Sequence, residues 1–262
     1  MRLRQTLWAS LLLTPLASGS ALAATRGNYD AFLARQEDKN LVAQDDSLRA
    51  RGLRVSQMED RLGVPSFVWN TRVGSSTASG MSSKMLGARK PDQAARAHLQ
   101  SVADLYRLGS EDVSAAQLKS VHQSGKGPVI ARFAQQVDGI EVFRNEVKVV
   151  MDRNLELVAV SGYLAPAQSA RKASAGGFKL PAEQAIAIAF QDQTGISMPA
   201  RGFVSNGQVN GAYSHFELDA STAHVLTHGL VVPARAKKVY YTLPDGLVPA
   251  WYVEVNTSQK SA

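Results

Sequence analysis

Apolar residues recur with a helical period in one stretch before the middle of the chain. Four of these residues are spaced at offsets of 0, 4, 7 and 11, which places them on one face of a helix: Ala95, Leu99, Val102 and Tyr106. Pro91 suits the first position of such a helix, and Gly109 favours its end. The pattern therefore predicts an amphipathic helix from Pro91 to Leu108 that packs on another element.

Alternating apolar and polar residues follow this helix. The alternation from Pro128 to Val137 ends at Asp138-Gly139, a pair typical of a two-residue hairpin turn, because both central positions need a positive φ. Further strands are predicted at 140–143, 147–151 and 155–160. A helix that precedes an antiparallel meander indicates an α+β fold with the helix on one face of the sheet.

A similar order of elements returns in the last third of the chain. Pro181-Ala182-Glu183-Gln184-Ala185 resembles Pro91-Asp92-Gln93-Ala94-Ala95, and the helix that it begins is expected to end at Gly195. Strands are predicted after it at 214–218, 225–232, 238–243 and 247–255. The predicted fold is thus α+β with two tandem modules, each a helix packed on an antiparallel β-meander.

Stretches with the composition of linkers set the expected domain boundaries. Gly74-Ser75-Ser76-Thr77-Ala78-Ser79-Gly80 is one of them, and residues 166–178 are another. Helices are expected at 29–44 and 47–62, and a short strand at 65–69. The predicted division is a leader at 1–23, a charged segment ending in a Ser/Gly linker at 24–84, a first module at 85–165, a linker at 166–178, a second module at 179–255 and a polar tail at 256–262.

The first residues have the pattern of a secretory signal peptide. Arg2 and Arg4 precede an apolar stretch, and Ala21-Leu22-Ala23 is a small-x-small site that predicts cleavage between Ala23 and Ala24. The alternative, an N-terminal membrane anchor, is disfavoured because Pro15 and Ser18-Gly19-Ser20 interrupt the apolar stretch. The protein is therefore expected to be secreted or periplasmic, without a transmembrane anchor.

Composition narrows the classes of function. The 262 residues contain no cysteine, which excludes disulfides, thiolate metal sites and a cysteine nucleophile. The formal charge is +7, and it falls to +5 without residues 1–23. Basic residues are spread along the chain without interleaved aromatics, so a nucleic-acid partner is not expected. An acidic protein surface or an anionic envelope polymer suits the charge better.

No motif predicts a catalytic, metal-binding or cofactor-binding residue. His224 and His228 have the spacing of a zinc motif, but Val225 stands where the motif needs Glu. In the predicted strand the two histidines would lie about 13 Å apart, too far to share an ion. Ser124-Gly125-Lys126-Gly127 is better explained as a hairpin loop than as a phosphate-binding loop.

One stretch resembles a known family. Ala131-Arg132-Phe133-Ala134-Gln135-Gln136-Val137-Asp138-Gly139-Ile140-Glu141-Val142-Phe143 is similar to the fungalysin/thermolysin propeptide (FTP) motif, and so is the continuation through Ser161-Gly162-Tyr163-Leu164. The residues that match the motif, all with an expected structural role, are Phe133, Asp138, Gly139, Ile140, Val142, Phe143, Ser161 and Gly162. Residues 181–255 resemble the PepSY-like half of such prodomains.

This resemblance implies cystatin-like and PepSY-like modules in a prodomain that helps a secreted zinc metallopeptidase to fold and keeps it inactive. The expected partner is a metallopeptidase catalytic domain, in cis or in trans. Zinc would belong to that domain, which this sequence lacks, so a truncated precursor or a relic is expected, and no enzyme. Two alternatives stay open: a stand-alone protease inhibitor and a basic envelope-binding protein.

Overall fold

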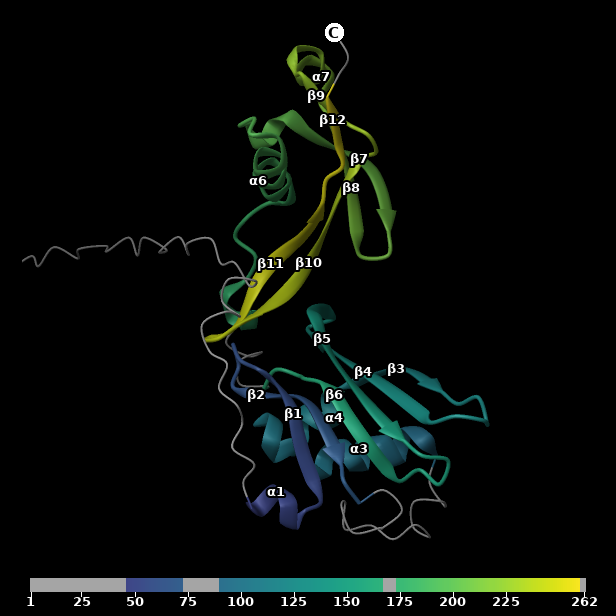
Figure 1. Ribbon diagram of the computed structural model, residues 1–262. Coiled ribbons are helices and arrows are strands. Elements are labelled where there is room, and N and C mark those ends of the chain that lie inside the picture. Colours follow the sequence, from purple (N-terminus) through teal and green to yellow (C-terminus); the bar gives the residue numbers. More distant parts are fainter. Residues whose placement is uncertain (1–45, 73–89, 167–172, 260–262) are drawn as a thin grey trace, which may run out of the picture. The chain divides into compact units, whose positions relative to one another are not determined.

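The computed structural model describes residues 46–72, 90–166 and 173–259 (Figure 1). Residues 46–166 are called the N-terminal half below, and residues 173–259 the C-terminal half. The N-terminal half contains α1 (Asp46–Ala50), β1 (Leu53–Glu59), β2 (Val64–Asn70), α3 (Pro91–Ser101), the 3-10 turn η2 (Ala103–Tyr106), α4 (Ser110–Ala115), β3 (Gln117–His122), β4 (Val129–Val137), β5 (Ile140–Met151) and β6 (Leu157–Gly162). The C-terminal half contains α6 (Ala182–Thr194), η3 (Ala200–Gly202), β7 (Phe203–Asn210), β8 (Tyr213–Leu218), α7 (Ala220–Val225), β9 (His228–Leu230), β10 (Ala234–Leu243), β11 (Gly246–Glu254) and β12 (Thr257–Gln259).

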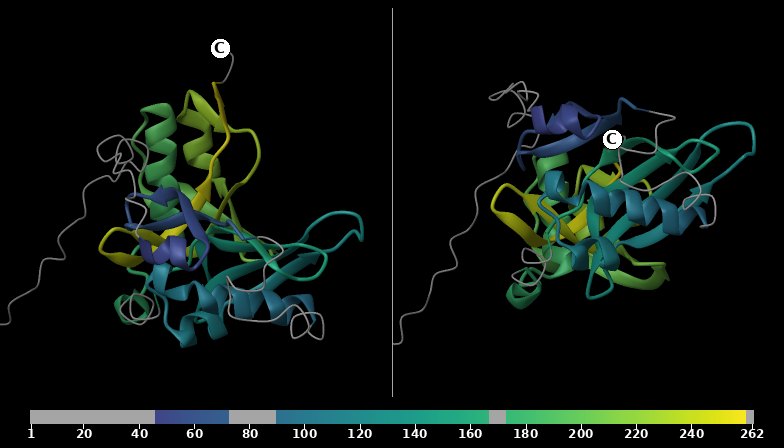
Figure 2. Two further views of the ribbon diagram at one scale, coloured as in Figure 1. Left: turned by 60° about the horizontal axis from the view of Figure 1, so that its bottom comes forward. Right: turned by 90° about the horizontal axis from the view of Figure 1, so that it is seen from below.

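Antiparallel strands and one crossing helix build the N-terminal half. The strands pair in the order β1–β2–β6–β5–β4–β3. Helix α3 lies across this sheet and contacts β3, β4, β5 and β6 (Figure 2). The predicted apolar stripe faces this contact, because at most 1% of each of its members is exposed: Ala95, Leu99, Val102 and Tyr106. They belong to the large core of this half, together with Phe133 and Met151.

A smaller core holds the C-terminal half together. Strands β11, β10, β8 and β7 pair antiparallel in that order, and α6 contacts β7, β10 and β11. Ile186 and Phe190 of α6 pack there with Phe203, Phe216 and Ala236. The short strands β9 and β12 pair with each other in a separate two-stranded sheet.

The two halves share one mixed sheet in the described part of the chain. Val142 of β5 pairs in parallel with Tyr240 of β10, and this bridge joins both sets of strands into a ten-stranded sheet. The α+β class is thereby confirmed. The two tandem modules are not seen as separate sheets, because the bridge connects them.

The helix expected at 47–62 is wrong. Helix α1 ends at Ala50, and Gly52 takes a positive φ of 70° before the chain continues as β1. Leu53 and Val55 are buried while Arg54 is exposed, so the burial alternates with the period of a strand. The predicted strand at 65–69 is confirmed as part of β2, which pairs with β6. The leader, the helix at 29–44 and the linker at 74–80 lie outside the described residues.

The helix expected at 91–108 is shorter than predicted. It ends at Ser101, whose hydroxyl donates to the His98 carbonyl, and continues only as the η2 turn. Arg107 then takes a left-handed conformation with φ 57°. Gly109 therefore does not end this helix. It is the N-cap of α4, where its N–H donates to Oδ2 of Asp112 at 2.7 Å.

One further prediction needs correction in the C-terminal half, and two other predicted segments contain short regular elements. The strand expected at 225–232 is largely wrong, because Asp219 caps α7 by accepting from the N–H groups of Ser221 and Thr222, and only β9 remains. The polar tail at 256–262 includes β12. The linker at 166–178 contains a short helix at 173–176. The sequence did not predict strand β7, because six of its eight residues are exposed and its pairing with β8 is interrupted.

Candidate functional site

Strands β3 to β6 form a ladder with one exposed outer strand. Among the described strands β3 pairs with β4 alone, and all six of its residues are exposed. Leu118 and Val121 are the apolar members, each about two-fifths exposed. The loop 123–128 joins β3 to β4 as a hairpin, which confirms the interpretation of Ser124-Gly125-Lys126-Gly127. As far as the structure describes the chain, this ladder presents an edge with unpaired main-chain groups and apolar side chains.

A tight turn joins β4 to β5. Asp138 and Gly139 have φ values of 50° and 78°, as a two-residue turn with both central residues left-handed requires. Both residues are exposed, and Oδ2 of Asp138 accepts a hydrogen bond from the Ser174 hydroxyl. Upstream in β4, Phe133 is fully buried, and the Arg96 guanidinium lies 5.0 Å from the centre of its ring. The predicted turn is confirmed.

An irregularity in β5 creates the bridge to the C-terminal half. Ala134 pairs with Glu146 and Gln136 with Glu141, so residues 142–145 lie opposite Gln135 alone. Arg144 takes a φ of 58° there. Such a bulge bends the strand and turns its side chains in new directions. The bulged residues are the ones that reach β10.

The bulged segment makes apolar, aromatic and polar contacts with the C-terminal half. Val142 is buried in a cluster that we call the junction cluster, whose members are Val137, Val142, Ala165, Ala173, Tyr240 and Leu247. The ring of Phe143 lies 4.9 Å from that of Tyr252, centre to centre. Thr242 donates its hydroxyl to Oδ1 of Asn145 at 2.9 Å. The motif residues Val142 and Phe143 thus lie at the junction of the halves, and Ile140 packs against the junction cluster.

Gly162 occupies a position that no other residue fits. Its φ is 87°, and a Cβ atom there would lie 2.0 Å from the backbone oxygen of Glu146. That oxygen accepts the N–H of Tyr163, so the chain cannot move away without losing the bond. Ser161, its neighbour in the motif, pairs with Lys148 and Phe67. Nothing in these contacts explains why serine is needed at that position.

Gln135 of the motif holds the segment that follows β6. Its Nε2 donates to the Ala165 carbonyl at 2.6 Å, and its Oε1 accepts the Ala165 N–H at 2.8 Å. One side chain thereby satisfies both main-chain groups of a buried residue that has no strand partner there. The sequence analysis quoted Gln135 without assigning it a role. Glutamine in a strand gives no signal of such a distant contact.

A charged cluster forms a second polar link between the halves. Nε of Arg61 donates to Oε1 of Glu59 at 2.5 Å, NH2 donates to the Tyr163 hydroxyl at 2.9 Å, and NH1 donates to the Tyr241 hydroxyl at 3.4 Å. The Arg61 and Glu59 side chains are only 8% and 10% exposed. Burial lowers the pKa of Arg61, but the hydrogen bond and charge of Glu59 outweigh this effect and raise it overall. Burial also raises the pKa of Tyr163.

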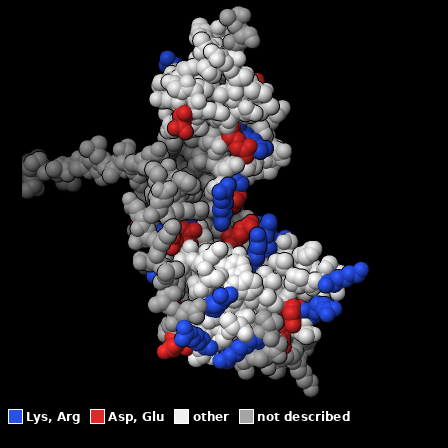
Figure 3. Space-filling model, viewed as in Figure 1, with Lys and Arg blue, Asp and Glu red and all other residues white. Residues whose placement is uncertain are grey.

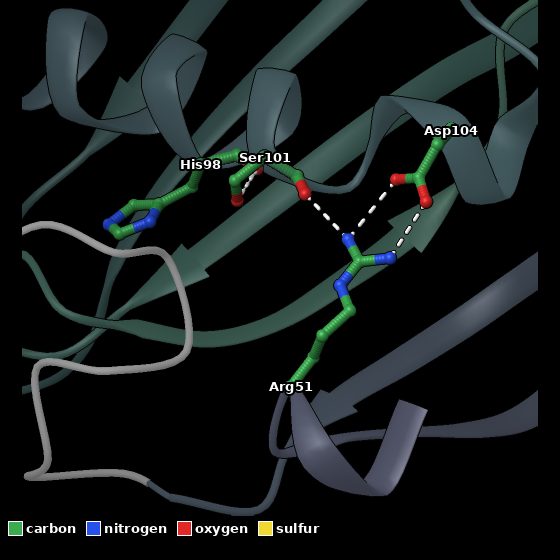
Figure 4. A network of polar contacts seen from close by, with 4 residues as sticks. All are labelled: Arg51, His98, Ser101 and Asp104. Atoms are coloured by element: carbon green, nitrogen blue, oxygen red, sulfur yellow. Dashed lines mark hydrogen bonds and ion pairs between the residues drawn. The ribbon is translucent and has the colours of Figure 1, made fainter. Parts of the chain in front are cut away.

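A third polar network ties the chain before β1 to the helix side of the core (Figure 4). NH1 and NH2 of Arg51 donate to Oδ2 and Oδ1 of Asp104, at 2.7 and 3.1 Å. NH2 also donates to the Ser101 carbonyl at 2.7 Å. The hydrogen bond from Arg51 lowers the pKa of Asp104. Nearby, buried His98 contacts the Leu155 carbonyl through Nε2 at 2.8 Å. These contacts join segments about fifty residues apart and are structural.

The face of β8, β10 and β11 opposite α6 carries alternating cations and aromatic rings. Lys237 lies 5.0 Å from the ring centre of Tyr213 and 5.4 Å from that of Tyr252, and it forms an ion pair with Glu141 of β5. Arg235 pairs with Glu254 at 2.6 Å and also lies over Tyr213. Charges of both signs are interspersed on the surface seen in Figure 3.

The described residues offer no constellation of metal ligands. Within residues 46–72, 90–166 and 173–259, no group of three or more His, Cys, Asp or Glu side chains could hold an ion. His224 belongs to α7 and His228 begins β9, so the strand assumed for this pair was wrong. The helices of the described ranges are all too short or too polar to cross a membrane. Ala23 and Ala24, the predicted cleavage site, lie outside the described residues.

One family model matches the part of the chain that forms the β3–β6 ladder. Residues 115–164 match the family model of the Fungalysin/Thermolysin Propeptide Motif, which covers β3, β4, β5 and β6. No curated protein matches the chain. Among solved structures, the Bacillus megaterium YpeB C-terminal domain is similar with 10% identity and a TM-score of 0.26, over 73% of this chain and 72% of that one. The resemblance of the sequence to the propeptide motif is therefore confirmed at 115–164.

Proposed function

We propose that this chain is a non-catalytic prodomain that binds the catalytic domain of a zinc metallopeptidase, assists its folding and holds it inactive. The match of residues 115–164 to the propeptide motif supports this proposal. In the structure the matched segment forms the β3–β4–β5–β6 ladder, which contains the Asp138-Gly139 turn, the bulge in β5 and Gly162. The leader at 1–23 would send the protein out of the cytoplasm.

Binding alone is sufficient for this function. A domain that binds the folded peptidase and not its unfolded chain stabilises the folded state by mass action. When both lie on one chain, the effective concentration reaches roughly millimolar, so modest affinity is enough in cis. In trans the same surface would make the protein an inhibitor. No catalytic group of this chain is needed for either role.

We place the docking surface at the outer edge of β3. This strand lies inside the matched range, pairs on one side only in the described part, and exposes Leu118 and Val121. An extended segment of a peptidase cleft can add to such an edge through main-chain hydrogen bonds, while neighbouring side chains give specificity. The outer strand β7 of the C-terminal half is also exposed but lies outside the matched range.

A peptidase assay tests the proposal. Thermolysin and a fungalysin, each with a fluorogenic peptide substrate, are titrated with the purified protein, and the recovery of activity after dilution from denaturant is measured with and without it. We expect inhibition, faster or more complete refolding, or both. The proposal fails if neither enzyme is inhibited or refolds better. Binding to anionic cell-wall polymer that falls steeply with salt, together with that failure, would favour the envelope-binding alternative.

Two matched variants locate the surface. Val121→Lys places a charge on β3, and Val209→Lys places the same charge on β7, where Val209 is 71% exposed. We expect Val121→Lys to weaken inhibition about tenfold, the effect of losing one apolar contact and adding a desolvation cost. Val209→Lys should leave inhibition unchanged. Equal effects of both variants, or none, would contradict the assignment to β3.

A further inference from the structure

The sheet of the N-terminal half has a second face, which is turned away from α3 and is called the open face below. The helical segments α1, α3, η2 and α4 all contribute residues to the core on the α3 side of the sheet. In Figure 1 α3 and α4 lie behind the strands, so the open face is turned toward the viewer. The side chains on this face are therefore those that alternate with the core residues along each strand.

The strand registers place two rows of side chains next to each other on the open face. The first row crosses the strands β1, β2, β6, β5, β4 and β3 with the directly paired residues Arg54, Trp69, Ala159, Val150, Ile130 and His122. The second row crosses the same strands with Gln57, Phe67, Ser161, Lys148, Arg132 and Ser120. Residues between the rows, such as Val149 and Val160, are fully buried in the core, which confirms that the two rows share the opposite face.

The middle of the first row is an apolar stripe formed by Trp69, Ala159, Val150 and Ile130. Trp69 is 37% exposed, and its ring lies 4.9 Å from that of Phe67, centre to centre. Val150 and Ile130 are half-buried. Neighbouring strands lie about 4.8 Å apart, so the stripe is about 14 Å long. Apolar residues that form a contiguous group on a surface, rather than being scattered, are typical of an interaction site.

The charged members of the two rows are all cations. Arg54, Lys148 and Arg132 are exposed, and Lys148 and Arg132 stand directly opposite each other beside the apolar stripe. Like charges in directly opposite positions destabilise a sheet. Oε2 of Glu146 lies 3.6 Å from Nε of Arg132, but both side chains are about two-fifths exposed, so this pair offsets the repulsion only weakly. Carboxylates from a partner would therefore complement this part of the face.

An apolar stripe beside two cations matches an amphipathic helix better than a polyanion. A polyanion binds through cations and has no use for the apolar stripe. A helix advances about 5.4 Å per turn, close to the strand spacing, so apolar residues three or four apart would meet successive members of the stripe. Acidic residues one turn apart on its flank would reach Lys148 and Arg132. Helix α3 already crosses the other face of this sheet in the same manner.

We propose that the open face docks an amphipathic helix of a partner protein, about three turns long, with an apolar stripe and Asp or Glu along one flank. Docking would give the sheet a helix on both faces, a common layer arrangement. The surface consists of side chains of the inner strands and does not use the main-chain groups at the edge of β3. The proposal is therefore independent of the docking surface assigned to the peptidase.

Two designed helical peptides of about 20 residues, a length at which an isolated helix can form in water, serve as probes. Both carry the same leucine stripe, and one has glutamates along one flank where the other has lysines. Each is titrated into the labelled protein at low salt, and the amide chemical shifts are followed. We expect the glutamate peptide to saturate with a Kd of about 1 mM, with the largest shifts in β2, β4, β5 and β6, and the lysine peptide to bind at least about tenfold more weakly. Equal binding of both peptides, no saturation, or shifts confined to the C-terminal half would overturn the proposal.

Lys148→Glu and the matched control Lys179→Glu separate a local effect from one of net charge. Both lysines are exposed, and both substitutions change the net charge equally, but Lys179 lies in the C-terminal half. We expect Lys148→Glu to weaken binding of the glutamate peptide about tenfold and to strengthen binding of the lysine peptide. Lys179→Glu should leave both affinities unchanged. The same change of affinity in both variants, or none in Lys148→Glu, would contradict the proposal.

Trp69→Ala tests the apolar stripe. Because both peptides share the leucine stripe, this variant should weaken both of them, the glutamate peptide about tenfold. A thermal melt and the dispersion of the amide shifts establish that the variant is folded. Unchanged affinity of a folded Trp69→Ala variant for the glutamate peptide would show that charge alone drives binding, and the assignment to an amphipathic helix would be wrong.

Discussion

The two halves of the protein are built from similar elements but differ in how deeply they bury them. The core of the N-terminal half contains residues from four helical segments (α1, α3, η2 and α4) and from the sheet, and most of them are almost fully inaccessible. In the C-terminal half one long helix covers the sheet, and residues such as Trp251 and Val253 remain partly exposed. The propeptide match falls entirely in the first of them. This contrast indicates that the N-terminal half is the stable scaffold and the C-terminal half the more easily opened one.

Replacing a large buried side chain by alanine should reveal the difference in stability between the halves most strongly. Phe133 and Phe190 are both fully buried, one in each core. Replacing either by alanine should cost about 3–5 kcal/mol of unfolding free energy. We expect Phe133→Ala to lower hydrogen-exchange protection in both halves, and Phe190→Ala to lower it only in the C-terminal half. Equal loss throughout the protein from Phe190→Ala would show that the halves open as one unit.

Two glycines with similar backbones sharpen the comparison. Gly162 in the N-terminal half has φ 87° and Gly207 in β7 has φ 75°, but a Cβ atom meets the Glu146 oxygen at the first and nothing within 4 Å at the second. Gly162→Ala should therefore destabilise by about 3 kcal/mol, and Gly207→Ala by about 1 kcal/mol. Denaturant unfolding measures both. Similar losses of unfolding free energy in the two variants would mean that the backbone around Gly162 can shift to accommodate a Cβ atom.

The two halves also differ in how deeply an ion pair is buried. Arg61 and Glu59 are largely buried, whereas Arg235 and Glu254 are about two-fifths exposed. Arg61→Met leaves the Glu59 carboxylate buried without its partner, and about 2–3 kcal/mol of stability should be lost. The double variant with Glu59→Gln should recover part of that loss. Arg235→Met is expected to change the melting temperature by no more than the scatter of replicates, and a larger shift would count against the contrast.

A small effect is expected from the pH dependence of the Arg51–Asp104 contact. Because Arg51 lowers the pKa of Asp104 in the folded protein, its contribution is full above the unfolded value near 4 and disappears as pH falls through the folded value. Both side chains are partly solvent-exposed, so screening reduces the contribution to about 0.5 kcal/mol. Asp104→Asn should be less stable than the wild type at pH 6, and the difference should vanish at a pH below the folded-state pKa of Asp104. A constant difference across that range would exclude this linkage.

Local patterns predicted much of the fold. The stripe from Ala95 to Tyr106, the Asp138-Gly139 turn and the helix ending at Gly195 follow from periodicity and turn chemistry, and the structure contains all three. The strand β1 was missed because the polar residues Arg54, Ser56 and Gln57 between Leu53 and Met58 also fit the polar face of a helix. Strand β7 could not be predicted from an alternation of apolar and polar residues, because most of its residues are exposed. Local sequence does not determine either case.

The candidate site was predictable only where the motif is local. Phe133, Gly139 and Gly162 stand at positions where burial or backbone conformation demands them. The contacts that join distant segments were invisible in the sequence: Gln135 with Ala165, and Arg61 with Tyr163 and Tyr241. Such contacts depend on a strand register and a bulge that no short-range pattern specifies. The expected role of the eight motif residues as structural positions stays a prediction.

Hydrogen exchange at β3 tests the central proposal most directly. Amide exchange of the protein is measured alone and with an excess of catalytically inactive thermolysin or fungalysin. We predict that the amides of Gln117–His122 gain protection, because a peptidase segment pairs with the outer edge of β3. Amides of β7 should be unchanged. Complex formation without added protection at β3, or no complex with either enzyme, would contradict the account.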